Sequence, residues 1–224
     1  RDRTRSRGLG DVYKRQVYGI PSGVLPPSLD PEEFPPESLS SEVSPLVGIE
    51  GPYVVTIGRA SWVKGTWETI SMLEHSGLSL ALVGGGEKES IDSLMEHAKS
   101  SKVGIWVAPR LESSELCSLI RGAVAVVSMA HSEPFGLSPI EAQSLGTPAL
   151  FVDEGGFRET ITDGVSGRLL PRNDYSAWHA ALEEAKDKHN RSSWSENGRV
   201  SISKMGLNPE VFSTRLENIF LDLD

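Results

Sequence analysis

The sequence predicts an α/β fold in which a doubly wound parallel sheet is covered by helices. Short apolar runs rich in β-forming residues alternate along the chain with stretches whose apolar side chains recur at helical spacing. These helical stretches are about ten residues or longer, which is enough to cross between parallel strands. Right-handed crossovers of this kind commonly give the strand order 3-2-1-4-5-6 in a Rossmann-like sheet.

The strands are predicted from apolar runs that end at glycine or at a polar residue. The first run, YVVTI, ends at Gly58, and the second ends in three consecutive glycines at residues 84–86. The sixth run, like the fifth, has only four residues. The six predicted strands are, in order, Tyr53–Ile57, Leu78–Val83, Gly104–Ala108, Val124–Met129, Ala149–Val152 and Gly167–Leu170.

The helices are predicted from apolar residues that lie three and four positions apart. The last helix also begins well, because Asn208 is a good N-cap and Pro209 suits the first helical position. The helical stretches are Trp67, Ile70 and Leu73, closed by Gly77; Ile91, Leu94, Met95 and Ala98; Ser113–Arg121; Ser138–Leu145; Tyr175–His189; and Pro209–Leu221.

The composition is that of an ordinary globular protein. Of 224 residues, 38% are hydrophobic and 24% are charged, close to the usual averages. The longest apolar runs, Leu80–Val83 and Ala123–Val127, are far shorter than the roughly 20 residues of a membrane helix. The single cysteine, Cys117, excludes an internal disulfide framework and fits a reducing compartment. We therefore expect a cytoplasmic protein, and peripheral membrane attachment of the full-length protein stays open.

The charge is unevenly spread and divides the chain into three parts. Residues 1–16 carry a net charge of +4 within a total of −9. They can be read as a basic arm for nucleic acid or lipid, but the string resembles translated adapter sequence and we exclude it from the fold. Residues 17–52 hold eight of the fourteen prolines and no Lys or Arg, which predicts an interdomain linker. The folded domain is expected over residues 53–224.

The acidic remainder disfavours nucleic acid as a partner for the bulk of the chain. An anionic ligand must then be held by a local cluster of cations and amides. In the predicted strand order the first and fourth strands are neighbours, and a crevice lies at their carboxyl ends. We expect the loop after the first strand (residues 58–65, the first loop) to face the loop after the fourth strand (residues 130–136, the second loop).

The second loop leads into a helix whose start suits a phosphate. Ser138 and Glu141 form a capping-box pattern with Pro139 at the first helical position. The amides of residues 136–138 then lie at a helix N-terminus, which attracts anions. Glu133 precedes Glu141 by eight residues, where a carboxylate can accept hydrogen bonds from sugar hydroxyls. In the alternative interpretation, Glu141 only caps the helix and Glu133 is a solvated loop acid.

The first loop supplies two cations, Arg59 and Lys64, on a turn bounded by glycines. Such a pair suits a diphosphate, because Arg binds it bidentately and Lys acts as a mobile point charge. The alternative is two solvated surface cations. Trp62 in the same loop either packs the loop or flanks a ligand, and His131 is a tolerated loop residue or a catalytic one.

The remaining motifs have weaker implications. Gly84–Gly86 does not fit a dinucleotide fingerprint and is expected to be a sharp turn for close approach of a ligand or a loop. Gly155-Gly156 serves either loop geometry or a ligand. The five histidines show no metal-ligand spacing.

Six motifs, in order and at the expected spacing, resemble the carboxyl-terminal, donor-binding domain of a family 4 glycosyltransferase with the GT-B fold. The match runs from about Val17 to Asp224. The motifs are an interdomain segment at Ile20–Val24, a GR…KG pattern at Gly58-Arg59 and Lys64-Gly65, a glycine turn at Leu82–Glu87, a base-contacting segment at Val107–Pro109, an E-x7-E motif from Glu133 to Glu141 followed by Gly146-Thr147-Pro148, and glycine-rich turns at Gly155–Glu159 and Gly164–Leu170.

The resemblance implies the donor half of a retaining glycosyltransferase that transfers a sugar from a UDP- or GDP-sugar, with no metal and no other cofactor. Arg59 and Lys64 would neutralise the diphosphate, Glu133 would bind the donor sugar, and Glu141 would bind the ribose. The residues implied in catalysis are Glu133, Arg59 and Lys64, and those implied in donor binding are Arg59, Lys64, Val107, Pro109, Glu133, Phe135, Gly136, Leu137, Ser138 and Glu141.

The chain departs from the family pattern in several ways. Ala130 stands where the family often has Ser, and Pro109 where it usually has Gly. No amino-terminal acceptor domain is encoded, so we expect a fragment truncated upstream and a partner domain that binds an unknown glycan, lipid or small-molecule acceptor. In the family the last helix packs toward that domain, which predicts an exposed apolar patch at Phe212, Leu216, Ile219 and Phe220.

Two alternative functions stay open. The first is a GT-B sugar-nucleotide epimerase, against which the intact E-x7-E motif argues. The second is a non-catalytic module that binds a nucleotide sugar without turnover.

Overall fold

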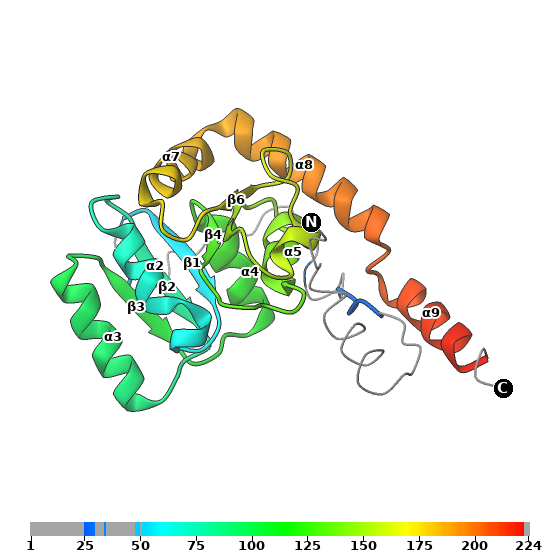
Figure 1. The fold of residues 1–224 in the computed structure, drawn as a ribbon, viewed down its shortest axis with the longest axis horizontal. Helices are drawn as coiled ribbons and strands as arrows, with labels where there is room; N and C mark the ends of the chain where they lie inside the picture. Colours follow the sequence, from blue (N-terminus) through cyan, green and yellow to red (C-terminus); the bar gives the residue numbers. More distant parts are fainter. Residues whose placement is uncertain (1–24, 30–33, 35–47, 50, 222–224) are drawn as a thin grey trace.

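A computed structural model describes residues 25–29, 34, 48–49 and 51–221. It contains six parallel strands in the order β3-β2-β1-β4-β5-β6, as predicted (Figure 1). The predicted limits of the first and fifth strands are confirmed to the residue, and the others differ at their ends by one or two residues. The strands are β1 (Tyr53–Ile57), β2 (Ser79–Val83), β3 (Ile105–Ala108), β4 (Val126–Ser128), β5 (Ala149–Val152) and β6 (Arg168–Leu170).

Helices cover both faces of the sheet, as right-handed crossovers in two directions require. The crossovers leading from β1 to β3 hold η1 (Trp62–Lys64, a turn of 3-10 helix), α2 (Thr66–Leu73) and α3 (Lys88–Ser100). Those leading from β3 to β6 hold α4 (Ser113–Gly122), α5 (Leu137–Ser144) and the short α6 (Phe157–Thr160). The carboxyl ends of β1 and β4 therefore meet where the connections change direction.

Three further helices follow β6, and the first two of them link the two faces. In α7 (Tyr175–Lys186), the His179 ring nitrogen Nε2 lies 2.7 Å from the Met72 carbonyl of α2. The next helix, α8 (Lys188–Met205), reaches α5 on the other face, where Gly198 lies against Gln143. Helix α9 (Pro209–Leu221) extends away from the sheet (Figure 1).

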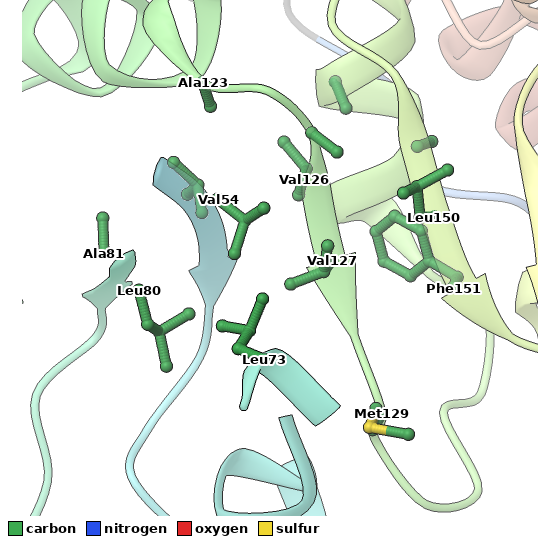
Figure 2. Packing of buried hydrophobic residues seen from close by; sticks show 14 of the residues in the cluster. Val54, Leu73, Leu80, Ala81, Ala123, Val126, Val127, Met129, Leu150 and Phe151 are labelled. Carbon is green, nitrogen blue, oxygen red and sulfur yellow. The ribbon is translucent and has the colours of Figure 1, made fainter. Parts of the chain in front are cut away.

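The central strands are buried because both faces of the sheet are covered. Val54, Val126 and Val127 have no exposed surface. Figure 2 shows these side chains beside Leu73 of α2 and Leu150 of β5. Burial of this apolar surface is the main stabilising contribution to such a domain, at about 25 cal/mol per Å².

Three helix predictions need correction. Helix α2 ends at Leu73, so Gly77 lies beyond it, in the turn before β2. Met95 is 44% exposed rather than directed to the core. The predicted helix over residues 175–189 is two helices, because the Asp187 carboxylate accepts hydrogen bonds from the amides of His189 and Asn190 and starts α8.

The N-cap of α9 is confirmed, because the Asn208 side chain accepts from the Val211 amide at 2.7 Å. No residue of α9 is buried, and Ile219, Phe220 and Leu221 are 40%, 61% and 71% exposed. The Pro-rich interval between residues 17 and 52 includes Phe34, which is buried in the core. Most of that interval, and all of residues 1–16, lie outside the described residues.

Candidate functional site

The first and second loops meet at the carboxyl ends of β1 and β4, as the strand order predicts. The His131 amide donates a hydrogen bond to the Val63 carbonyl oxygen at 2.8 Å. Gly65, at φ 63°, lies against Met129, the residue just before the second loop. A Cβ atom at Gly65 would be 2.0 Å from the Met129 carbonyl oxygen. Gly65 is therefore required both by its left-handed backbone and by this contact.

Lys64 and Glu133 form an ion pair between the two loops. The Lys64 ammonium Nζ lies 2.8 Å from the Glu133 carboxylate oxygen Oε2, and the two side chains are 40% and 22% exposed. The Lys64 stem passes beside Gly58, where an added Cβ would lie 3.4 Å from Lys64 Cδ. Two predicted site residues, 69 positions apart in the chain, are thus brought into contact across the crevice.

Lys64 is positioned by the η1 turn. The Ser61 hydroxyl accepts from the Lys64 amide at 3.3 Å, and the Gly65 amide donates to the Trp62 carbonyl at 2.9 Å. Arg59, just before this turn, is exposed, and it forms no ion pair with a described residue. The first loop therefore presents one cation paired with the second loop and one that is exposed.

The predicted capping box at the start of α5 is wrong. The helix starts at Leu137, one residue earlier than predicted, and its N-cap is Gly136 at φ 86°. Pro139 is the third helical residue, where its missing N–H costs no helical hydrogen bond. Tertiary packing fixes this start, because a Cβ at Gly136 would lie 2.7 Å from the Phe157 ring. A capping box does occur at α4, between Glu112 and Glu115.

The shifted start leaves the amides named in the sequence analysis at the N-terminus of α5. The amides of Leu137 and Ser138 are in the first turn of α5 and have no acceptor within the helix. Leu137 is 39% exposed, and Glu141 lies on the following turn, half-buried. Phe135, also half-buried, precedes the N-cap. The helix N-terminus thus follows the second loop, which holds Glu133 in contact with Lys64.

The glycine turns of the other strands support the two loops. The Gly156 amide donates to the Glu133 carbonyl at 2.7 Å, and a Cβ at Gly156 would lie 2.4 Å from Phe135 Cα. The Gly155-Gly156 pair therefore serves loop geometry. In the same way, a Cβ at Gly84 would lie 2.6 Å from the Gly58 backbone. The turn after β2 therefore needs glycine because the first loop passes close to it.

Val107 and Pro109 lie at the far end of this carboxyl edge. Val107 pairs with Leu82 in the sheet and is half-buried, and Pro109 is exposed just beyond β3. Strand β3 is three positions from β4 in the sheet, a separation of about 14 Å at the usual interstrand spacing. Val107 and Pro109 thus lie at the β3 end of this edge, whereas Glu133 lies in the loop that follows β4.

Arg172 is a central residue that sequence reasoning missed. It lies two residues after the end of β6, and its side chain is only 14% exposed. Its guanidinium donates to both carboxylate oxygens of Glu154 at 2.7 and 2.9 Å, to Glu68 at 3.2 Å and to the Met129 carbonyl at 2.6 Å. The hydrogen bonds from Arg172 to Glu154 lower the pKa of the Glu154 carboxyl. A charged residue just beyond a strand's carboxyl end was the available signal.

The Arg172→Ala variant is expected to lose about 2 kcal/mol of unfolding free energy, since it leaves Glu68 and Glu154 without their cation. The pKa of Glu154 is lowered in the folded state. The Arg172–Glu154 pair therefore stabilises the fold at a pH above the pKa of an unfolded glutamate. This stabilisation is lost as the pH falls through the lowered pKa of the folded state. Urea denaturation at neutral pH and at about pH 3.5 checks both statements. The Arg158→Ala variant removes an exposed pair with Asp153 at 2.6 Å and should cost under about 1 kcal/mol. Equal losses in the two variants would contradict the role of Arg172.

The described part of the chain contains neither a candidate metal site nor a candidate membrane-spanning helix. No group of three or more His, Cys, Asp or Glu side chains there is arranged to hold a metal ion. None of the helices in that part is both long enough and apolar enough to cross a membrane.

The sequence between residues 45 and 201 matches the family described as Glycosyl transferases group 1. The chain belongs to this family. Its six-stranded order is that of the family's carboxyl-terminal domain. A structure of the carboxyl-terminal domain of a group 1 glycosyl transferase from Francisella tularensis aligns with 79% of this chain and 97% of that one, at a TM-score of 0.65 and 22% identity.

The chain is also similar to two curated relatives. A D-inositol 3-phosphate glycosyltransferase from Xylanimonas cellulosilytica is 29% identical over 172 residues, 71% of this chain. A glycogen synthase from Mycobacterium tuberculosis is 30% identical over 138 residues, 58% of this chain. The matches cover 41% and 33% of these relatives' own lengths.

Longer structures show the same fold. A sucrose-phosphate synthase from Thermosynechococcus elongatus aligns with 98% of this chain and 57% of its own, at a TM-score of 0.82 and 20% identity. An Anabaena protein in complex with UDP and glucose aligns with 97% of this chain and 62% of its own, at a TM-score of 0.83 and 18% identity.

Proposed function

We propose that this chain is the donor-binding domain of a retaining glycosyltransferase that transfers a sugar from a UDP- or GDP-sugar to an acceptor. The observation that carries the proposal is the contact between Lys64 and Glu133 beside the N-terminus of α5. A cation, a carboxylate and helix N-terminal amides are gathered at the point where a doubly wound sheet binds ligands. Residues 17–52 would link the domain to an amino-terminal acceptor domain.

In this proposal the diphosphate lies between the first loop and α5. Lys64 and the exposed Arg59 neutralise it, and the amides of Leu137 and Ser138 donate to its oxygens. During transfer, the acceptor oxygen bonds to the anomeric carbon while the bond from that carbon to the diphosphate breaks. The diphosphate leaves with the electron pair of the broken bond, and one of its oxygens takes up the proton of the acceptor hydroxyl. The cations act mainly by stabilising this growing negative charge.

The other donor groups are assigned to residues along the same edge. Glu133 would accept hydrogen bonds from the sugar hydroxyls, and Glu141 from the ribose. The base would lie toward Val107 and Pro109, at the other end of the crevice. Phe135 and Gly136 would line the phosphate and sugar part. This order follows the carboxyl edge of the sheet from β3 to β4.

The relatives support the reaction class. The names of both curated relatives given above describe transfer of a sugar unit, and the Anabaena protein has also been solved with UDP-glucose. Calorimetric titration of the chain with UDP and with GDP tests the proposal. We expect saturable binding of one of them, and binding of neither would contradict the proposal.

The Glu133→Gln variant is expected to change two affinities in opposite directions. In the free chain Glu133 neutralises Lys64, so its removal should free the ammonium and raise the affinity for UDP by about threefold, the size of an exposed ion pair. The extra affinity for UDP-glucose over UDP should fall, since the sugar loses a charged acceptor. Titration with both ligands measures the two effects. Glu96→Gln, at an exposed position on α3, serves as the control. A fall in the UDP affinity of Glu133→Gln would contradict the proposed role of Glu133.

A further inference from the structure

Trp62 is the large side chain of the site to which the proposed function assigns no role. It is 66% exposed, whereas Trp178 has no exposed surface and Trp194 only 6%. Trp178 also donates its indole N–H to the Pro171 carbonyl at 3.0 Å, as a structural tryptophan usually does. Trp62 contributes little to the core, so burial in the core does not account for it.

The Trp62 indole is nevertheless held in place. It stacks on the His131 imidazole, with ring centroids 6.3 Å apart and planes inclined by 16°, which is an offset stack. His131 is fixed in turn, because its Nε2 lies 3.0 Å from the Glu68 carboxylate and its amide donates to the Val63 carbonyl. The Trp62 backbone belongs to the η1 turn, closed by the left-handed Gly65. One indole face therefore lies against His131 while most of the side chain stays in solvent.

A flat, fixed aromatic face of this kind complements the C–H face of a pyranose ring. The ring buries apolar C–H groups on the indole while its hydroxyls point outward to polar partners. Polar groups of this kind stand on the same two loops as Trp62 and His131. Lys64 lies two residues after Trp62, and Glu133 lies 2.8 Å from the Lys64 ammonium. We propose that Trp62 is a stacking platform for a pyranose ring of the acceptor.

This inference rests on the proposed function for the choice between acceptor and donor. The diphosphate is assigned to Lys64 and the α5 amides, the donor sugar to Glu133, and the base to the β3 end of the crevice. The outer indole face is used by none of these groups. An acceptor hydroxyl must reach the anomeric carbon beside the diphosphate, and Trp62 shares the η1 turn with Lys64, the residue assigned to that diphosphate. The platform thus selects acceptors that carry a pyranose near the reacting hydroxyl.

The test is fluorine NMR of the full chain, labelled with 5-fluorotryptophan and saturated with UDP. The chain has five tryptophans, and the Trp62 resonance is assigned by its loss in Trp62→Phe. Three pyranoside probes are titrated: maltotriose, cellobiose and methyl α-mannoside. Sorbitol, which has similar hydroxyls but no ring, is the control. We expect at least one pyranoside to shift the Trp62 resonance saturably, and sorbitol to leave it unchanged.

Saturation-transfer titrations of the variants give a second readout. Trp62→Ala should weaken binding of that pyranoside about tenfold, and Trp62→Phe should restore most of it. The affinity for UDP-glucose relative to UDP should stay the same in Trp62→Ala. A loss of this preference would mean that the indole serves the donor sugar, and it would overturn the inference.

Other outcomes also overturn the inference. These are no shift with any of the three pyranosides, equal binding by Trp62→Ala, or a Trp62 resonance that moves with protein concentration instead of sugar. The same samples separate this failure from failure of the proposed function. If UDP binds and no pyranoside does, only the platform is wrong. If neither UDP nor GDP binds, the donor site is wrong as well.

Discussion

Replacing Gly65 with alanine is expected to lower the unfolding free energy by about 4 kcal/mol or more, the size reserved for severe steric or backbone conflicts. The new Cβ would lie 2.0 Å from the Met129 carbonyl oxygen and 2.9 Å from Met129 Cβ, in a left-handed conformation that alanine disfavours. Neither neighbour is a flexible chain end, so the first loop must move away from β4. Thermal or urea denaturation measures the loss, and UDP binding should fall with it.

Gly77→Ala is the matched control. Gly77 has φ 70°, close to the 63° of Gly65, but no atom outside its immediate chain neighbours would lie within 4 Å of a methyl group added there. It therefore reports the backbone cost alone, about 1–2 kcal/mol. Equal losses in the two variants would show that contact with β4 is not what requires glycine at position 65.

The double variant Arg59→Ala/Lys64→Ala is expected to bind UDP about a hundredfold more weakly than the unmodified chain. Each charge-assisted hydrogen bond contributes roughly 1.5–3 kcal/mol when it is shielded from water, and partial exposure of both cations reduces the sum to about 3 kcal/mol. Fold stability should change little, because Arg59 is exposed and the Lys64–Glu133 pair is partly exposed. Calorimetric titration gives the affinity, and circular dichroism checks the fold.

The double variant Lys99→Ala/Lys204→Ala removes the same charge from exposed positions on α3 and α8. It separates a local diphosphate contact from a general effect of net charge. Its UDP affinity should stay within about twofold of the unmodified chain. Matching losses in both double variants would contradict a specific role for Arg59 and Lys64.

The strand order and the meeting of the two loops could be predicted from the sequence because both follow from general rules. Alternating apolar periodicities specify the βαβ units, and the handedness of the crossovers leaves few orders for the strands. With β1 beside β4, the loops that carry Lys64 and Glu133 must share one edge of the sheet. The family membership, matched over residues 45–201, agrees with that derivation.

The start of α5 and the role of Arg172 could not be predicted, because tertiary contacts decide both. Ser138 and Glu141 make a good local capping signal, but the contact of Phe157 with Gly136 requires glycine one residue before the helix. Arg172 bonds to Glu68, 104 positions earlier, and to the Met129 carbonyl, 43 positions earlier. Local sequence patterns cannot indicate contacts between residues that are so far apart in the chain.

The measurement that tests the proposed donor site most directly is a map of backbone amide shifts as UDP is added to the labelled chain. We expect the largest shifts at the first loop and at Gly136, Leu137 and Ser138. A cavity of about 430 Å³ at the opposite end of the sheet, lined in part by His75, Ser79 and Lys102, is the natural rival location. Shifts gathered around that cavity, or none at either place, would contradict a donor site at the carboxyl ends of β1 and β4.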